Sequence, residues 1–216
     1  MEPTFGIGIP TINRYDLLHP TLGLYSKEFP DIDIFVLDNG KQGIKNQNRI
    51  KVIEPNESKC VGASWNILIE KIFEKNNYAL ILNDDIYLGK STENIKNIII
   101  SSGAKQKNKA FLTATPDWCA FIISQKIFKL VGKFDECFIP AYYEDNSYAY
   151  RMKLKGVPHI KTPLLNPFIY RSSCSLEKDY DILEARKKNK KIYIEMWGGE
   201  PEKEKYLTPY NSQKKQ

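Results

Sequence analysis

The residues best suited to chemistry form a short acidic run, Asn83-Asp84-Asp85, which follows the apolar stretch Tyr78–Leu82. The stretch does not alternate, as expected of a central strand covered on both faces, and Asn and Asp commonly end strands. Two carboxylates beside an amide oxygen offer the hard ligands that suit Mn²⁺ or Mg²⁺. Open α/β sheets bind ligands outside the carboxyl ends of their strands, so a metal-bound diphosphate is the expected ligand. The same tripeptide also fits an ordinary turn, in which side-chain oxygens accept from local backbone amides.

A second acidic pair, Glu144-Asp145, opens a helix expected to end at Gly156. Asp145 could remove a proton from an acceptor hydroxyl as a general base. Carboxylates in a first helical turn are also favoured by the helix macrodipole alone. Asp135 and Glu136, just upstream, could fix the loop before an acceptor site or touch the substrate, and the structural role is the interpretation preferred.

Two further side chains have both a chemical and a structural interpretation, and a third has a chemical one. His159 could supply a metal ligand, although a single His at a strand start more often has a structural role. Trp118 could stack on an acceptor sugar or pack in the core. Arg171 could neutralise phosphate charge.

The elements that must position these residues follow from hydrophobic periodicity. Strands are expected at Phe5–Pro10, Ile32–Leu37, Lys51–Glu54 and Tyr78–Leu82, with helices at Tyr15–Tyr25 and from Val61 to about Asn76. This order predicts a doubly wound, mainly parallel α/β sheet flanked by helices. Polar residues after the strands would then line one crevice, with the helix that begins near Gly62 aiming backbone amides at it: Thr11, Asn13, Arg14, Asp38, Asn39 and the acidic run.

The second half continues the same pattern. A helix is expected at Ile95–Ile100, strands at Ala110–Thr115 and Ala120–Ser124, a helix at Gln125–Val131 and a charged, exposed helix at Leu176–Ile194. The prediction is one domain, residues 1–216, with a nucleotide-binding half (1–90), an acceptor and catalytic half (91–175) and a C-terminal helix and tail (176–216).

Composition sets the broad class. The formal net charge of +6 is modest, and no aromatic-basic motif accompanies it, so nucleic acid is not an expected partner. The cysteines Cys60, Cys119, Cys137 and Cys174 lack metal or redox spacing and fit reduced thiols. No stretch approaches the length that spans a bilayer, and we expect a cytoplasmic protein, in the host cytoplasm if it is viral.

The sequence lacks the glycine-rich motifs of two large classes of nucleotide-binding enzymes. No GxGxxG or Walker-type loop is present, which disfavours dinucleotide dehydrogenases and P-loop phosphotransferases. The order IPTINR, VLDNG, VGASWN, LILNDD, GKFDE and the pair Glu144-Asp145 resembles the family 2 glycosyltransferases and their GT-A fold, over roughly Phe5 to Pro158. Beyond it, the tail from Met196 looks like that of small phage and large-virus glycosyltransferases, where it is interpreted as a flap over the sugar site or a tail pinned by one Trp.

The resemblance implies a function and assigns residues to it. The donor would be a nucleoside diphosphate sugar, UDP-linked as a first guess and GDP- or dTDP-linked otherwise, and the acceptor a glycan or glycoconjugate hydroxyl. Asp38 would read the base and Asp85 would hold the metal, although Asn83 replaces the first acid of the family's D-x-D motif. Asp145, with Glu144, would be the base of an inverting transfer. The donor site would comprise Pro10, Thr11, Asn13, Arg14, Asp38, Asn39, Gly62, Asn66, Asn83, Asp84 and Arg171, and the metal site Asp85, Asn83 and His159.

A different class of function also fits this sheet. A nucleotide-sugar-binding protein would not need the second acidic pair, and a nucleotidyltransferase would usually carry a Gly-rich basic loop after its first strand, which IPTINRYD lacks.

Overall fold

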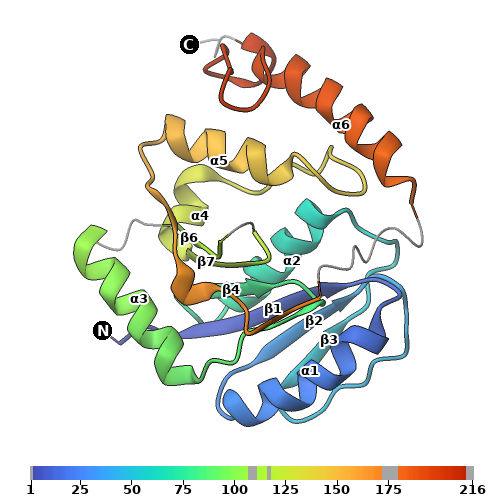
Figure 1. Ribbon diagram of the computed structural model, residues 1–216, viewed down its shortest axis with the longest axis vertical. Coiled ribbons are helices and arrows are strands. Elements are labelled where there is room, and N and C mark those ends of the chain that lie inside the picture. Colours follow the sequence, from blue (N-terminus) through green and yellow to red (C-terminus); the bar gives the residue numbers. More distant parts are fainter. Residues whose placement is uncertain (1, 107–110, 116–117, 172–179, 213–216) are drawn as a thin grey trace.

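A computed structural model describes residues 2–106, 111–115, 118–171 and 180–212 of the protein. Its centre is a seven-stranded sheet in the order β3-β2-β1-β4-β7-β6-β8 (Figure 1). The strands are β1 (Phe5–Thr11), β2 (Ile34–Asp38), β3 (Ile50–Ile53), β4 (Tyr78–Leu82), β6 (Phe111–Thr113), β7 (Ala120–Ser124) and β8 (His159–Lys161). A separate ribbon pairs β5 (Ile86–Tyr87) with β9 (Ile169–Tyr170) in antiparallel fashion.

The strand directions bring the expected polar residues to one edge. β3, β2, β1 and β4 run parallel to one another, and β7 runs against β4 and β6. Thr11, the last residue of β1, is in register with Asp38, the last residue of β2. Because parallel strands end at a common edge, Thr11, Asp38 and the acidic run after β4 gather there.

Helices cover both faces of the sheet and bury two separate cores. On one face, α1 (Tyr15–Glu28) and α3 (Thr92–Gln106) pack against side chains such as Ile7 and Ile9. On the other face lie α2 (Val61–Phe73), α4 (Gln125–Val131) and α5 (Glu144–Leu154). β1 has no polar side chain along most of its length because both its faces are buried, which explains its unbroken apolar sequence.

A third layer lies outside α5. Helix α6 (Ile182–Trp197) runs above α5 in Figure 1, far from the sheet. The sequence predicted a charged, exposed helix, and for the described part that prediction is wrong on one face, where Ala185, Asn189, Tyr193, Met196 and Trp197 are buried. Their spacing is helical, but lysines on the other faces mask the pattern. Short 3₁₀ turns, η1 (Pro163–Leu165) and η3 (Pro209–Asn211), complete the described elements.

Cysteine chemistry and membrane insertion can be checked against the same coordinates. Cys60, Cys119 and Cys137 are free thiols, and Cys174 lies outside the described residues. Of the helices in the described segments, none has the length and apolar character needed to cross a bilayer.

Candidate functional site at the carboxyl edge of the sheet

The acidic run forms a turn directly after β4. Asp84 and Asp85 are almost fully buried, and Asn83 is half-buried. The hydroxyl of Thr11 donates to Asp84 Oδ2 at 2.8 Å, so the end of β1 orients this carboxylate. The backbone amide of Asn83 donates to the carbonyl of Cys119 at 2.9 Å, which ties the turn to the start of β7. The two neighbouring strands therefore hold the turn in place.

A later part of the chain closes over the same turn. β9 pairs with β5, and the backbone amide of Arg171 donates to the carbonyl of Asp85 at 3.1 Å. The side chain of Arg171 is exposed. The structure thus brings the backbone of Arg171 to the acidic turn across 86 positions of sequence.

The donor set of this turn fits a hard divalent cation. Asn83, Asp84 and Asp85 offer two carboxylates and one amide oxygen, the ligand types that Mn²⁺ and Mg²⁺ prefer. No group of three or more His, Cys, Asp or Glu side chains within the described ranges is arranged to hold a metal ion. A cation here would therefore need further ligands beyond these three side chains.

His159 does not belong to this site. It lies on β8, three strands from β4, or about 14 Å at the usual strand spacing. Its Nε2 shares a hydrogen bond of 2.9 Å with Thr113, and its ring packs against Phe111 and Trp118. Burial lowers the pKa of this imidazole. The prediction of His159 as a metal ligand is therefore wrong, because the strand order separates it from the acidic turn.

Trp118 is part of the aromatic core. Its ring is 4.8 Å from that of Phe111 and 6.4 Å from that of Trp65, centroid to centroid. The structural interpretation of Trp118 fits this packing, and the sugar-stacking interpretation does not.

Asp38 organises a loop and faces away from solvent. It is 0% exposed, and its carboxylate accepts from the backbone amides of Gly40 and Gln42 and from the side-chain amide of Gln42, at 2.7–3.1 Å. Direct reading of a base by Asp38 does not fit this burial. The sequence showed an acid at the end of a strand. It could not show that amides of the following loop donate hydrogen bonds to both carboxylate oxygens of Asp38.

The rest of this loop is held by close approach and by polar contacts. A Cβ on Gly40 would lie 2.4 Å from Asn13 Oδ1, so the two loops meet only because residue 40 is glycine. Asn39 donates to Ser64 Oγ on α2 and accepts from the amide of Lys59.

Two more of the expected donor residues have local roles. Arg14 is buried, and its Nε pairs with Asp16 at 3.1 Å in the first turn of α1. Pro10 is half-buried within β1. Pro10 thus lies near the carboxyl end of β1, and the guanidinium of Arg14 is paired with Asp16.

The amino end of α2 is covered by another loop of the chain. The amide of Val61 donates to the carbonyl of Pro140 at 2.9 Å, and a Cβ on Gly62 would lie 2.7 Å from the carbonyl oxygen of Asp135. Gly62 therefore permits a close approach between α2 and another loop of the same chain, which leaves no room for a nucleotide on that side of Gly62.

Asn66 is a second correction on α2. It is buried and exchanges hydrogen bonds with both backbone groups of Phe134, at 2.8 and 2.9 Å, and its Nδ2 also donates to Glu136. Asn66 thus fastens the Gly132–Glu136 motif to α2. The role expected for Asp135 and Glu136, fixing a loop, fits these contacts better than substrate binding.

The second acidic pair sits at the start of α5 after a strained approach. Tyr142 and Tyr143 both have positive φ, 76° and 79°, a conformation that non-glycine residues seldom adopt. Glu144 is 5% exposed, and its Oε2 has no hydrogen-bond partner in the described part of the chain. Burial, reinforced by Asp145, raises the pKa of Glu144 well above its ordinary value. Asp145 is half-buried.

A continuous path of contacts joins the two acidic sites. Thr11 bonds Asp84 through its hydroxyl and accepts from the amide of Asn39 through its carbonyl, at 2.9 Å. Asn39 then bonds Ser64 on α2, and Gly62, two residues earlier, lies against Glu144, whose Cβ is 3.5 Å from the position a Gly62 Cβ would take. The structure therefore brings the acidic turn and the start of α5 to the same edge of the sheet.

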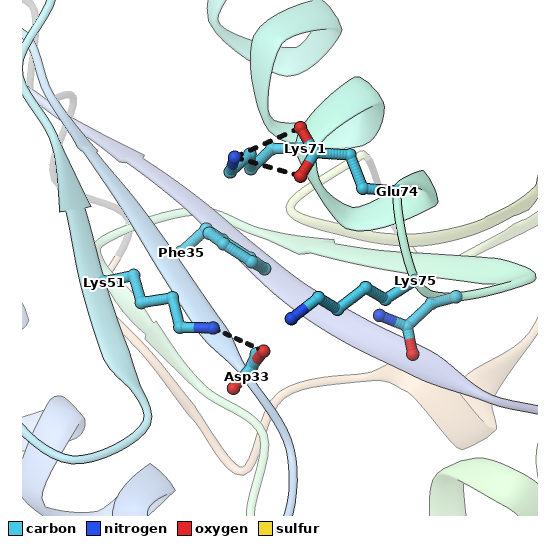
Figure 2. Close-up of a pocket in the computed structure, with 7 residues that line it drawn as sticks. Asp33, Phe35, Lys51, Lys71, Glu74 and Lys75 are labelled. Carbon is cyan, nitrogen blue, oxygen red and sulfur yellow. Dashed lines mark hydrogen bonds and ion pairs between the residues drawn. The ribbon is translucent and has the colours of Figure 1, made fainter.

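A cavity elsewhere does not belong to this site. It measures about 180 Å³ and is lined by Asp33, Phe35, Lys51, Lys71, Glu74, Lys75 and Asn76. Figure 2 shows the ion pair between Lys51 and Asp33 at its margin, 2.6 Å long. Asp33 precedes β2 and Asn76 precedes β4, so the cavity lies at the amino ends of the strands, opposite the acidic turn.

Comparisons with known proteins identify the fold. No protein-family model matches the sequence, and no curated protein matches it. The mannosyltransferase PcManGT from Pyrobaculum calidifontis, solved with GDP-Man and Mn²⁺, matches with TM-score 0.60 and 13% identity over 77% of this chain and 56% of that chain. GalNAc-T7, solved with UDP, GalNAc and Mn²⁺, matches with TM-score 0.66 and 12% identity over 90% of this chain and 48% of that chain.

These likenesses show a GT-A glycosyltransferase fold, which confirms the predicted fold class. This chain spans about half the length of either matched protein.

Proposed function

We propose that this protein is a metal-dependent glycosyltransferase that moves a sugar from a nucleoside diphosphate sugar to a hydroxyl of a glycan or glycoconjugate. The observation that carries the proposal is the contact path from Asp84 through Thr11 and α2 to Glu144, on a GT-A fold. Such a transfer needs one group of residues at the leaving diphosphate and another at the acceptor hydroxyl. A protein that only binds nucleotide sugars would not need the second.

The acidic turn is proposed as the donor diphosphate site. Asp85 and Asn83 would hold Mn²⁺ or Mg²⁺, with Asp84 oriented beside them by Thr11. The cation, when bound, neutralises charge on the leaving diphosphate. Arg171, which the β5–β9 ribbon brings to the turn, would add positive charge to the same group. UDP is the first candidate nucleotide, with GDP and dTDP as alternatives, and the matched proteins were solved with UDP or GDP-Man.

Asp145 is proposed as the base that accepts the acceptor's proton. Its neighbour Glu144 is 5% exposed, and burial raises the pKa of that carboxyl. Asp145 is more exposed than Glu144, as a base that faces an acceptor must be. One base and a leaving group on the opposite face give a single displacement, which inverts the anomeric carbon.

The order of motifs also favours a place among the family 2 glycosyltransferases, including their small phage and large-virus members. The motifs GKFDE and Glu144-Asp145 are spaced as in that family, and Asn66 and Gly62 show how VGASWN supports them.

A thermal-shift panel of UDP, GDP and dTDP sugars, each with and without Mn²⁺, tests the donor site. Ligand binding raises the apparent stability by mass action, so a true donor should raise Tm only with the metal. Asp85→Ala should remove this metal-dependent shift, and Asp31→Ala, an exposed acid away from the edge, should keep it. A donor shift in Asp85→Ala with unchanged metal dependence would overturn the assignment.

The catalytic assignment needs a separate variant. Asp145→Asn should keep the donor-induced shift and lose transfer by about 10²-fold or more, because a general base acts mainly in the transition state. Full transfer by Asp145→Asn would show that another group is the base, and no transfer by the wild type with any donor of the panel would leave a binding protein as the explanation. Proton NMR of the new linkage reports the stereochemistry, and retention would refute the single displacement.

A further inference from the structure

Helix α6 contacts the approach to Glu144-Asp145 through one buried side chain. Asn189 is 0% exposed, and its Nδ2 lies 2.7 Å from the carbonyl of Ala141 and 3.2 Å from that of Ile139, with Tyr142 O at 3.4 Å. These carbonyls belong to the loop that ends at the Tyr142–Tyr143 pair. One amide group therefore contacts three backbone carbonyls in the four residues that precede Tyr143 and the acidic pair.

The chemistry of Asn189 favours positioning over packing. Its Oδ1 is buried and lacks a hydrogen-bond partner in the described part of the chain, which costs stability. An apolar side chain of similar size would avoid that cost but would leave the carbonyls of Ile139 and Ala141 without their donor. Asn189 therefore contributes through the N–H groups of its side-chain amide, which donate to the carbonyls of the loop 139–142.

A second contact holds the same loop by its side chain. The guanidinium of Arg186, one turn before Asn189, lies 4.1 Å from the ring centroid of Tyr142. Tyr142 has φ of 76°, so α6 contacts both the main chain and the ring of a strained residue. Such conformations persist only where surrounding contacts determine them.

The end of α6 holds the first turns of α5 as well. Trp197 Nε1 donates to Ser147 Oγ at 2.9 Å, and Ser147 donates to Asp135 Oδ2 at 2.5 Å. Arg151 pairs with the same carboxylate at 3.2 Å. Ser147 lies two residues after Asp145, so α6 fixes the chain on both sides of the acidic pair.

We infer that α6 is a clamp that sets the position of Asp145, with Asn189 as a positioning residue and Arg186 and Trp197 as its supports. The role of Asp145 rests on the proposed function. The clamp does not rest on it, because these contacts should order the loop 139–143 and the first turn of α5 whatever reaction takes place there.

Amide hydrogen exchange tests the clamp without any substrate. Asn189→Leu should speed exchange in peptides covering 139–147 by about tenfold, as expected on loss of a buried donor, while peptides of β1 and β4 stay at the wild-type rate. Lys188→Leu is the matched control, because it places the same side chain at the adjacent, exposed position of α6. Arg186→Ala should raise exchange in the same peptides by a smaller factor, and its exposed position leaves folding intact.

Unchanged exchange in 139–147 for a folded Asn189→Leu variant would overturn the clamp. If that variant does not fold, unchanged exchange in Arg186→Ala and Trp197→Phe would also overturn the clamp.

Two measurements, nucleotide binding and steady-state kinetics, separate the clamp from the proposed function. UDP or GDP binding with Mn²⁺ should stay within about twofold of wild type in Asn189→Leu, because the acidic turn is untouched.

With a donor that passes the wild-type panel, Asn189→Leu should lower kcat by about 10²-fold and leave the donor KM within about twofold, the pattern of a misplaced catalytic group. Equal losses in kcat and donor affinity would show a general structural role. If the wild type binds no nucleotide, the proposed function fails and the exchange result still decides the clamp.

Discussion

Removal of the Thr11 hydroxyl is the most specific single change that can be made to the acidic turn. This hydroxyl donates to Asp84 at 2.8 Å between two buried groups, across 73 positions of sequence. Thr11→Val keeps the shape of the side chain and removes the donor. Thr11→Ser keeps the donor and removes one methyl group. The pair therefore separates the hydrogen bond from the packing around it.

The structure sets the expected size of each effect. A hydrogen bond to a charged group is worth about 1.5–3 kcal/mol, and burial of Asp84 limits replacement of the lost donor by water. Thr11→Val should therefore lower the free energy of unfolding by about 1.5–3 kcal/mol. Loss of one buried methyl group in Thr11→Ser should cost about 1 kcal/mol.

Urea denaturation of both variants measures the stability terms, and titration of UDP or GDP in Mn²⁺ measures the site. We expect Thr11→Ser to bind the nucleotide within about twofold of wild type and Thr11→Val to bind it about tenfold more weakly, because Asp84 loses its orientation. Equal nucleotide affinity in the two variants would refute the reasoning that the Thr11–Asp84 bond organises the turn.

Three further predictions concern the loop that carries the second acidic pair. Asn66→Leu should destabilise the protein by about 3–5 kcal/mol in urea, because it leaves both backbone groups of Phe134 unpaired, and a loss below about 1 kcal/mol would contradict this. Gly62→Ala should lower Tm, because its Cβ would meet Asp135 O at 2.7 Å, and an unchanged Tm would show that the loop yields. Because the pKa of Glu144 is raised in the folded state, wild-type stability should fall as pH rises above about 4.3, the unfolded value. Glu144→Gln should flatten this slope in urea titrations at several pH values, and a slope identical to wild type would exclude Glu144 as its source.

The part of the site that could be predicted from the sequence follows from one rule, that parallel strands end at a common edge of the sheet. The expected β4 and the structural β4 have the same bounds, and Thr11, Asp38 and the acidic run meet at one edge as the parallel order requires. These features depend on local hydrophobic patterning and on strand direction, and both are written in the nearby sequence.

The errors share a different physical origin. The carboxylate oxygens of Asp38 accept hydrogen bonds from amides of its own loop, and Asn66 and Gly62 face another loop of the protein. Each was assigned to a ligand because it is a polar or small residue near a strand end. Whether such a residue faces a ligand or the protein depends on contacts with residues distant in sequence, and hydrophobic periodicity carries no information about them. His159 failed for a related reason, since strand order within a sheet is not local either.

The segment between α4 and α5 shows why the second half of the chain is harder to predict from sequence. Its backbone joins no strand, yet much of it is buried, and buried carbonyl and amide groups need partners. Those partners come from three helices: Asn66 and the amide of Val61 on α2, Arg151 on α5 and Asn189 on α6. An apolar residue at any of these side-chain positions would pack equally well and leave the backbone unpaired. The position of Asp145 is therefore set by amide and guanidinium donors up to 79 residues away from the groups they serve, as in the contact between Val61 and Pro140. It follows that substitutions on the buried face of α6, although remote from the acidic turn, should act on the rate of transfer more than on the binding of the donor.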